Sequence, residues 1–425
     1  MEEEVKVIKK QIRKVIEAID AQNKWRKLEC INLIASENVM SPLAAKLYVS
    51  DFMHRYAEGD VGDRHYQGGR YIDDVEGLAI ELMKSLFNTD FTDLRPLSGS
   101  MANLACFKAL TEIGDLLFAL SVPCGAHISH QTFGSAGMVG TKVKPFPFDV
   151  ERMNIDVDAT IKKVRREKPN LLVFGGSVFL FPNPLKEFRE VADELGIRIM
   201  YDAAHVLGLI AGKKFQDPLR EGADVVSSST HKTFPGPQGG LIFTNDEELF
   251  ERLKTAIFPG IVSNHHCHRI PSLCITLLEM QKYGEEYANT VLINAQKLAV
   301  ALVERGFKVL AESYGFTQSH QVVLDVSSLG GGGKVAIELE KANIIVNKNL
   351  LPWDPVTSTE NPSGVRIGVQ EITRFGMLEN EMDQIAEFME KILIKGKNPY
   401  HTKEEVISFR KDFITPKFCF QNTKI

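Results

Sequence analysis

The sequence has no long apolar run and no strong excess of charge of one sign. Hydrophobic residues make up 44% of its 425 residues, charged residues make up 25%, and the formal net charge is −5 at pH 7. No stretch reaches the roughly 20 apolar residues of a membrane-spanning helix, and no apolar leader segment or basic block stands out. A soluble protein that acts on small molecules is therefore expected, with no nucleic-acid and no membrane partner.

Cysteine is scarce: six residues are scattered along the chain without paired spacing. This pattern is not typical of a disulfide framework, so a reducing, cytoplasmic location is expected. The stretch His265-His266-Cys267-His268 suggests a metal site at first sight. Zinc ligands are usually spaced in pairs, and adjacent side chains rarely converge on one ion, so we expect no metal.

A lysine in a polar, glycine-rich setting is the most informative feature. A short strand around Val225 and Val226 leads into small hydroxyl residues, then His231 and Lys232, and then glycines and prolines that cannot continue a helix. The pKa of a lysine falls readily on desolvation, and the neutral amine can form a Schiff base with an aldehyde. Pyridoxal phosphate is the candidate aldehyde, and a solvated loop lysine is the alternative.

An aspartate ends the strand-like run from Arg198 to Tyr201. A pyridoxal ring works as an electron sink only while its ring nitrogen is protonated, and a buried carboxylate such as Asp202 favours that proton. The alternative is an ordinary helix N-cap after a strand.

Small residues precede a helix-like stretch at 101–110, whose apolar spacing is helical. Ser98, Gly99 and Ser100 would leave free N–H groups and hydroxyls facing an anion, helped by the helix dipole. On its own this motif is usually a helix cap, but upstream of Asp202 and Lys232 it completes a candidate cradle for pyridoxal phosphate.

These motifs carry a family resemblance: the chain resembles serine hydroxymethyltransferases, which are fold-type I pyridoxal phosphate enzymes. The resemblance extends over about residues 30 to 380. The matching segments, in the order and near the spacing of the family, are 33–38, 55–59, 64–66, 98–100, 202–206, 230–233, 342–344 and 365–368.

The resemblance implies an α/β fold with a mostly parallel seven-stranded sheet flanked by helices. A smaller α+β C-terminal domain and an N-terminal helical arm are implied with it. We expect the arm over 1–30, the large cofactor-binding domain over 31–280, and the small domain with its tail over 281–425.

The residue pattern agrees with this organisation. An amphipathic helix is expected over 1–27, and a long helix over 271–305 is expected to bridge the two domains. Strands alternate with helices in the first domain, as in a layered α/β protein. The expected strands are 171–174, 197–201, 241–243, 322–326 and 344–346, and further helices are expected over 185–195 and from 334.

The resemblance also implies roles for cofactor-binding residues. Lys232 would form the Schiff base, Asp202 would contact the ring nitrogen, and His127 would stack on the ring. Ser98, Gly99 and Ser100 would bind the phosphate, and Ser177 with His205 would contact the ring oxygen. The further implied cofactor-binding residues are Tyr56, Ser229 and Asn264.

Substrate and catalytic roles follow from the same resemblance. Arg366 would take the substrate carboxylate, because a planar guanidinium matches a carboxylate and an unpaired arginine between apolar strand residues would be costly. The other implied substrate-binding residues are Ser36, Glu58, Tyr66 and His205, and the implied catalytic residues are Lys232, Glu58, His231 and Tyr66.

Glu58 is the candidate for the one-carbon step, the reversible conversion of serine and a reduced pterin to glycine and the methylene-pterin. This transfer needs an acid–base group near both the serine hydroxyl and the pterin. In the family, the segment with Tyr56, Glu58 and Tyr66 reaches into the site of the partner subunit, so a homodimer with shared active sites is implied.

Several positions depart from the family pattern. Gln238 replaces an arginine, residues 258–266 replace a glycine-rich loop, and Gly125-Ala126 replaces a pair of glycines. The tail from about residue 395 has no counterpart, and the role of the 265–268 cluster stays open. These departures affect how one subunit would bind the cofactor phosphate of its partner subunit.

The one-carbon carrier is either tetrahydromethanopterin or tetrahydrofolate. The stretch 178–182 is apolar where the family is more polar. An apolar wall would suit a carrier with extra methyl groups and without the glutamate tail of folate, which favours tetrahydromethanopterin.

Two other functions are compatible with parts of this pattern. A threonine-aldolase-type lyase would share Lys232, Asp202 and Arg366 but would not need the pterin-side segment around Glu58. A non-catalytic cofactor-binding protein would be expected to have lost Lys232 or Glu58, and both are present.

Overall fold

The structure is a computed structural model and describes residues 1–421. Its centre is a seven-stranded sheet with the order β4-β12-β11-β10-β9-β5-β6. All neighbouring pairs are parallel except those of β12, which is antiparallel to both β11 and β4. The strands are β4 (Phe91–Asp93), β5 (Leu116–Ala119), β6 (Lys142–Pro145), β9 (Leu171–Gly175), β10 (Arg198–Asp202), β11 (Val225–Ser229) and β12 (Gly240–Thr244). The seven strands confirm the predicted sheet.

Both faces of this sheet are covered, because side chains alternate along each strand. Leu172 and Phe174 join the larger core, which also contains apolar residues of α3, α7, α8 and α11. Leu171 and Val173 point to the second core, which they share with α4 and α10. These helices are α3 (Arg70–Phe87), α4 (Gly99–Leu110), α7 (Leu185–Leu195), α8 (Leu207–Ala211), α10 (Glu247–Thr255) and α11 (Arg269–Glu304).

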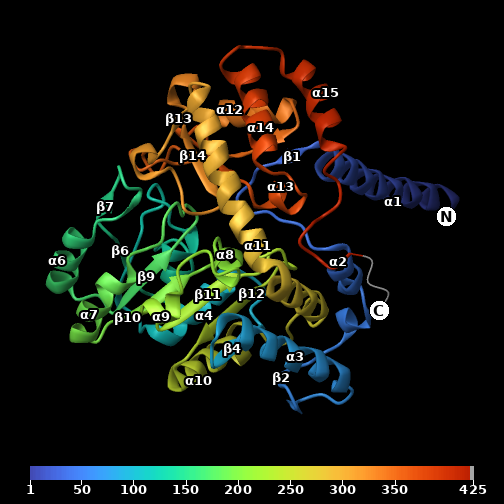
Figure 1. Ribbon diagram of the computed structural model, residues 1–425. Coiled ribbons are helices and arrows are strands. Elements are labelled where there is room, and N and C mark those ends of the chain that lie inside the picture. Colours follow the sequence, from blue (N-terminus) through green and yellow to red (C-terminus); the bar gives the residue numbers. More distant parts are fainter. Residues whose placement is uncertain (422–425) are drawn as a thin grey trace.

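A second, antiparallel sheet lies in the C-terminal part of the chain, with the order β13-β14-β17-β16. Helices α12 and α14 pack beside it (Figure 1), and the predicted 36-residue helix α11 extends from α3 at one end to α14 at the other. The elements are β13 (Lys308–Val309), β14 (Gln321–Asp325), β16 (Asn347–Asn349), β17 (Gly364–Gly368), α12 (Gly332–Lys341), α13 (Gln370–Arg374), α14 (Glu379–Leu393) and α15 (Pro399–Arg410). The division at residues 30 and 280 stays a prediction, and residue 280 falls inside α11.

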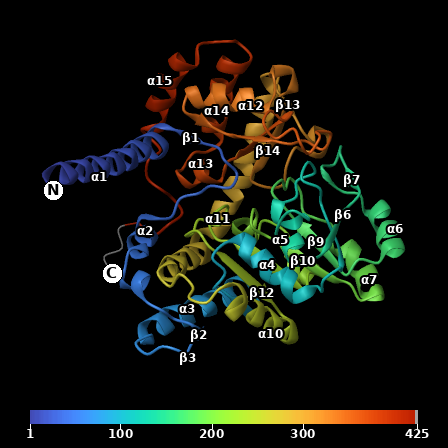
Figure 2. The ribbon, with the colours of Figure 1, turned by 180° about the vertical axis from the view of Figure 1, so that it is seen from behind.

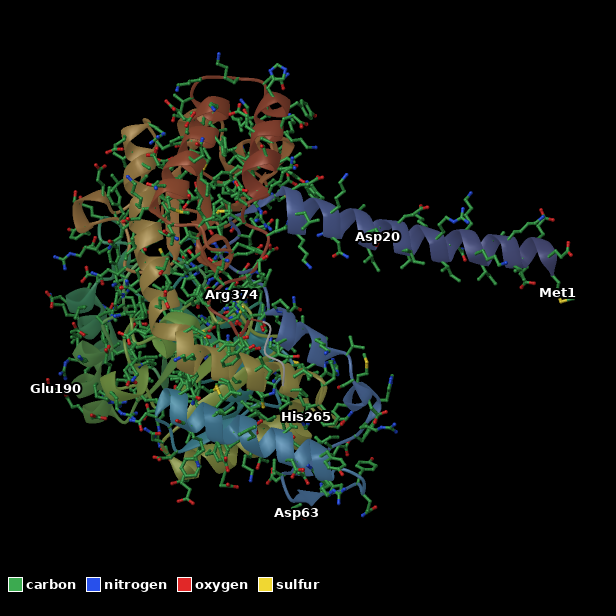
Figure 3. The ribbon with its side chains drawn as sticks, turned by 45° about the vertical axis from the view of Figure 1, so that its right-hand side comes forward. Met1, Asp20, Asp63, Glu190, His265 and Arg374 are labelled. Atoms are coloured by element: carbon green, nitrogen blue, oxygen red, sulfur yellow. The ribbon has the colours of Figure 1, made fainter. Side chains whose placement is uncertain are left out.

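The first helix, α1 (Glu2–Gln22), projects from the body in every view, with Met1 and Asp20 on the free part (Figures 1, 2 and 3). None of its residues is buried. A π-helical turn (Asn23–Glu29) follows, and then β1 (Ile31–Asn32) pairs in parallel with β15 (Ile344–Ile345). The N-terminal segment is therefore attached to the C-terminal part of the chain through β1.

The remaining elements are short. Strands β2 (Gly59–Asp60) and β3 (Asp63–Arg64) form a hairpin, and β7 (Phe148–Asp149) pairs with β8 (Asn154–Ile155). The other helices are α2 (Pro42–Tyr48), α5 (Ser135–Met138), α6 (Val157–Glu167) and α9 (Pro218–Glu221). Within residues 1–421 no helix combines the length and the apolar character needed to cross a membrane.

The tail beyond α15 is held by buried polar contacts. Arg374 of α13 forms a fully buried ion pair with Glu279 of α11 at 3.0 Å and donates to the carbonyl of Phe418 at 2.6 Å. The other oxygen of Glu279 accepts from the backbone N–H of Phe420 at 3.3 Å. A tail for which the sequence offered no counterpart is therefore fastened to the long helix.

We predict that Glu279→Leu lowers the free energy of unfolding by about 3–5 kcal/mol, because it leaves the Arg374 cation buried without an anion. Urea unfolding measures this loss. The matched control is Glu286→Leu, an exposed position two turns along the same helix, which should change it by about 0.5 kcal/mol or less. The double variant Glu279→Leu/Arg374→Met should recover much of the loss. Equal effects of Glu279→Leu and the control would contradict this account.

Candidate active site

Lys232 lies in the loop after β11, where the predicted strand ends at Ser229. Its Nζ donates to the Ser229 hydroxyl at 2.8 Å, and its carbonyl accepts from the amide of Asn38 at 2.6 Å. Burial lowers the pKa of Lys232 to about 8; the Asp202 carboxylate opposes this shift and the Arg366 cation adds to it. A large fraction of this amine is therefore neutral near physiological pH.

Asp202 ends β10 beside this loop and is almost completely buried. Its Oδ2 accepts from Asn103 Nδ2 at 2.8 Å and lies 2.9 Å from His130 Nε2, and its Oδ1 accepts from the N–H of Ala204 at 3.0 Å. Burial opposes the charge, but the hydrogen bonds from His130 and Asn103 outweigh it and hold the pKa of Asp202 well below its usual range. Asp202 is a fixed, buried anion.

Asn103 and His130 were not predicted from the sequence. Asn103 lies on α4, one helical turn beyond Gly99, and its Oδ1 accepts from the hydroxyl of Ser227 at 2.6 Å. His130 follows the predicted His127 by three residues. Their short distances in sequence from Gly99 and His127 were the only indication of a role in the site. Only the tertiary structure shows that both side chains contact the carboxylate of Asp202.

The phosphate candidates lie at the start of α4, next to Ser229. The Ser98 hydroxyl caps this twelve-residue helix by accepting from the N–H of Met101 at 3.2 Å. A Cβ atom on Gly99 would lie 3.3 Å from Ser229 Cβ, a tight contact, so the close approach of the two segments favours glycine. The first-turn N–H groups and the hydroxyl of Ser100 form an anion cradle beside Lys232.

His127 is a half-buried, neutral ring. Burial lowers its pKa to about 4. Its Nδ1 accepts from the N–H of Ser129 at 3.2 Å, so the proton of the ring is on Nε2. A neutral, fixed imidazole suits the predicted stacking role.

Arg366 comes from β17 in the second sheet. Its Nε donates to Asn347 at 3.1 Å, and its Nη1 donates to the carbonyl of Ser177, which joins the two sheets. Burial lowers its pKa to about 10, and no carboxylate among residues 1–421 forms an ion pair with it. A buried guanidinium without an anion fits a site for an anionic substrate group.

His205 is buried beside these residues, and its ring is stacked on that of His320 with centroids 5.6 Å apart. Burial, with the nearby cations of Lys232 and Arg366, lowers the pKa of His205 well below its ordinary value. Gln321 contacts both the His205 ring and the carbonyl of Ser177. Gln321, His320 and Asn347 were also missed by sequence reasoning.

His231 and Ser36 line a separate cavity of about 700 Å³ together with Asn38. Burial lowers the pKa of His231 to about 4, and its Nδ1 is buried without a hydrogen-bond partner among the described residues. Asn38 connects this cavity to the lysine loop through its bond to the Lys232 carbonyl. His231 is next to Lys232 in the chain, and the roles of His231 and Ser36 stay predictions.

Tyr56, Glu58 and Tyr66 form a separate, outward-facing group. The two tyrosine rings meet edge to face at 5.5 Å and are about half exposed, and Asp63 in the same segment lies at the edge of the body (Figure 3). Within residues 1–421 no hydrogen bond joins this group to Lys232, Asp202 or Arg366.

The segment that carries Glu58 is nevertheless held firmly. Arg64 pairs with Asp73 at 2.7 Å and Glu76 at 2.6 Å, and its Nη1 donates to the carbonyls of Ala57 and Gly59 at 2.8 Å each. Asn264 accepts from the N–H of Ala57 at 3.0 Å, which places it against this segment of its own chain. The backbone on both sides of Glu58 is therefore fixed.

The histidine cluster has a structural part in this arrangement. His265 Nε2 lies 3.2 Å from Glu76, the same carboxylate that pairs with Arg64, while His266 and His268 stack on each other. His265 therefore supports Glu76 and, through it, the Arg64 contacts.

The donor set fits pyridoxal phosphate. It combines an amine with a lowered pKa, a buried carboxylate that stays ionised, and an anion cradle at a helix start. The close contact of Gly99 with Ser229 brings the cradle next to the amine. The amine can react with an aldehyde, the carboxylate can contact a protonated ring nitrogen, and the helix start can bind a phosphate.

Comparison with known proteins agrees with the geometry. The family model described as serine hydroxymethyltransferase matches residues 8–389. A serine hydroxymethyltransferase of Saccharolobus islandicus is 52% identical over 415 residues, covering 98% of this chain and 96% of that protein. One from Sulfolobus acidocaldarius is 51% identical over 418 residues, with the same coverage of 98% and 96%. One from Aeropyrum pernix is 52% identical over 403 residues, covering 95% and 92%.

A solved structure shows the same fold. The crystal structure of L-threonine transaldolase from Pseudomonas fluorescens aligns with a TM-score of 0.89 and 27% sequence identity. The alignment covers 99% of this chain and 96% of the transaldolase chain.

We predict that Lys232 of the cofactor-free protein reacts with an amine-selective reagent with a midpoint near pH 8. At that pH about half of the side chain is neutral, against well under 1% for a lysine of pKa about 10.4. Mass spectrometry of the labelled peptide across pH measures this midpoint, with exposed Lys186 as the internal reference.

Two variants should move this midpoint in opposite directions. Asp202→Asn removes an anion that raises the pKa of Lys232, so the midpoint should fall, whereas Arg366→Met removes a cation that lowers it, so the midpoint should rise. A wild-type midpoint near 10, or no shift in either variant, would contradict the account of the site.

Proposed function

The chain belongs to the serine hydroxymethyltransferase family, and from this premise we propose which of its residues transfer the hydroxymethyl group of serine to a reduced pterin. The protein is a pyridoxal phosphate-dependent transferase of the fold-type I class. The observation that carries the assignment of roles is the buried Arg366 guanidinium, without a carboxylate partner in the described chain, beside an amine whose pKa is lowered to about 8.

When bound, pyridoxal phosphate supplies an aldehyde for the amine and a ring that withdraws electrons from the substrate. Lys232 Nζ would be the nucleophile for that aldehyde, and Asp202, which stays ionised, would keep the ring nitrogen protonated. His127 would hold the ring face, and His205 with Ser177 would hold the ring oxygen. Phosphate binding is assigned to Ser98, Gly99, Ser100 and Ser229.

The amino-acid substrate is bound by its carboxylate. Arg366 offers a guanidinium fixed by Asn347 and by the Ser177 carbonyl, so little side-chain entropy remains to be lost on binding. Ser36 and His205 complete this side, and His231 next to Lys232 is proposed to assist the reaction. These roles are supported by the positions of the residues around the lysine loop.

Glu58 is proposed as the acid–base group for the hydroxymethyl transfer, in the site of a partner subunit. Glu58 lies in a rigid but outward-facing segment with Tyr56 and Tyr66. A half-buried glutamate in a segment whose backbone is fixed on both sides, next to two half-exposed tyrosines, supports a homodimer in which each site combines two chains. Asn264 and Tyr56 are proposed to reach the cofactor of the partner in the same way.

The cysteines support the expected cytoplasmic location, since all six are free thiols in the structure.

A threonine-aldolase-type lyase is the second candidate. The solved L-threonine transaldolase shares the fold at 27% identity, whereas the hydroxymethyltransferase relatives share about 52%. The rigid pterin-side segment with Glu58 supports the hydroxymethyltransferase as the main activity. Serine cleavage with and without a pterin separates the two, because a lyase would not need the carrier.

We predict that Glu58→Gln abolishes most pterin-dependent serine turnover while amino-acid binding persists, because the amide keeps the shape but cannot exchange a proton. Lys232→Ala should also lose turnover. Mixed dimers of the two variants should regain activity, since one of their two sites contains both intact residues. Stable heterodimers without activity would place Glu58 in the site of its own chain.

The choice of pterin remains a prediction, and the structure changes its basis. Val178, Phe179 and Leu180 are buried in the core, with Phe179 packed on Tyr201 and Phe215, so this stretch provides no open apolar wall. Ile128, beside the stacking His127, is 59% exposed and is the apolar residue that still favours tetrahydromethanopterin.

We predict a higher kcat/KM with tetrahydromethanopterin than with tetrahydrofolate as the carrier in serine-to-glycine conversion. Ile128→Asn should reduce the difference in kcat/KM between the two carriers, because it weakens the apolar contact with tetrahydromethanopterin. A clearly higher value for tetrahydrofolate in the wild-type enzyme would end this part of the proposal.

A further inference from the structure

Gln321, the first residue of β14, lies fully buried between the two sheets. Its Oε1 accepts from the backbone N–H of Phe179 at 2.9 Å. Its Nε2 lies 3.0 Å from the carbonyl oxygen of Ser177 and 3.0 Å from Nδ1 of His205. One carboxamide therefore contacts the backbone on both sides of Val178 and the ring of a site histidine.

The partners leave one orientation for this carboxamide. A backbone N–H can only donate, so the group facing Phe179 must be the oxygen. A carbonyl can only accept, so the group facing Ser177 must be the NH₂. The orientation of the amide thus follows from two backbone groups, and the NH₂ is the end that meets His205.

This orientation decides where the proton of His205 lies. The NH₂ has two hydrogens, one for the Ser177 carbonyl and one for His205 Nδ1, so Nδ1 accepts and carries no proton. His320 Nε2 is also 3.3 Å from the amide nitrogen, but it lies 3.2 Å from the carbonyl of Ala35, to which it donates. Because the buried His205 ring is neutral, its single proton is on Nε2.

We propose that Gln321 is a positioning residue that fixes His205 as the Nε2–H tautomer, so that His205 offers the ligand a hydrogen-bond donor. The atom that His205 recognises is then an acceptor oxygen, such as the ring oxygen of the cofactor or a substrate carboxylate oxygen. This inference rests on the proposed function for the identity of the ligand, but the tautomer itself is a property of the protein alone.

The same carboxamide also links His205 to Arg366. The Ser177 carbonyl accepts from both Gln321 Nε2 and Arg366 Nη1. A shift of the Gln321 carboxamide would therefore change the directions in which both the His205 ring and the Arg366 guanidinium donate hydrogen bonds.

The test is the tautomer of His205 in the cofactor-free protein, measured by ¹⁵N NMR of imidazole-labelled protein, with the signals assigned by their loss in His205→Asn. The protonated and unprotonated ring nitrogens resonate far apart, and couplings to the ring protons distinguish Nδ1 from Nε2. We expect wild-type His205 to carry its proton on Nε2.

Two substitutions change the partner of Nδ1. Gln321→Glu replaces the donor by a carboxylate, which should draw the His205 proton to Nδ1. Gln321→Met removes the donor with little change in volume, so both tautomers of His205 should be populated. The matched control is Gln318→Glu, which adds the same charge at an exposed position three residues away and should leave the His205 signals unchanged.

A second readout is the affinity for pyridoxal phosphate, which should fall about tenfold or more in Gln321→Glu but not in Gln318→Glu, because a donor to an anionic oxygen is lost. Wild-type His205 with its proton on Nδ1, or a pure Nε2–H tautomer in Gln321→Met, would overturn the proposal. If Gln321→Glu does not fold, Gln321→Met decides the question. Failure of the proposed enzyme function would show as absent turnover without any change in the wild-type tautomer.

Discussion

The site depends on one buried charge, the carboxylate of Asp202. An isolated carboxylate would become protonated at such a depth, but three donors, from His130, Asn103 and the backbone of Ala204, stabilise the ionised form. This anion limits how far the pKa of Lys232 falls, so that the amine titrates near pH 8. Through Asn103 and Ser227 it also fastens the start of α4 to β11, which brings the phosphate cradle to the lysine loop.

The residues proposed for the one-carbon transfer lie in a different environment from those proposed to bind the cofactor. Lys232, Asp202 and Arg366 lie in or next to buried strands, whereas Tyr56 and Tyr66 are about half exposed. The backbone on both sides of Glu58 is fixed by Arg64 and Asn264. The arrangement is explained if the exposed side completes the site of a second copy, and it makes cofactor binding and one-carbon transfer separable by mutation.

The sequence predicted the residues whose chemistry is local and missed those defined by tertiary contact. Lys232, Asp202 and the Ser98–Ser100 turn were found because each ends or begins a regular element, where the spacing of apolar and small residues is informative. The long helix α11 and the strands β9, β10, β11 and β12 of the central sheet were found for the same reason. Asn103, His130 and Gln321 are separated from the partners described above by 72 to 144 residues, so no local pattern marks them. The apolar run 178–182 shows the opposite error, since it was predicted to face a ligand but residues 178–180 are part of the core.

The central claim is that Asp202 stays ionised although it is buried, and ¹³C NMR of protein labelled at the aspartate carboxyl carbon tests it most directly. The Asp202 signal is identified by its absence in Asp202→Asn. The account predicts that this signal keeps its ionised position from pH 8 down to about pH 4, where an ordinary aspartate of pKa about 3.9 is nearly half protonated. A shift toward the protonated position at or above that pH would contradict it.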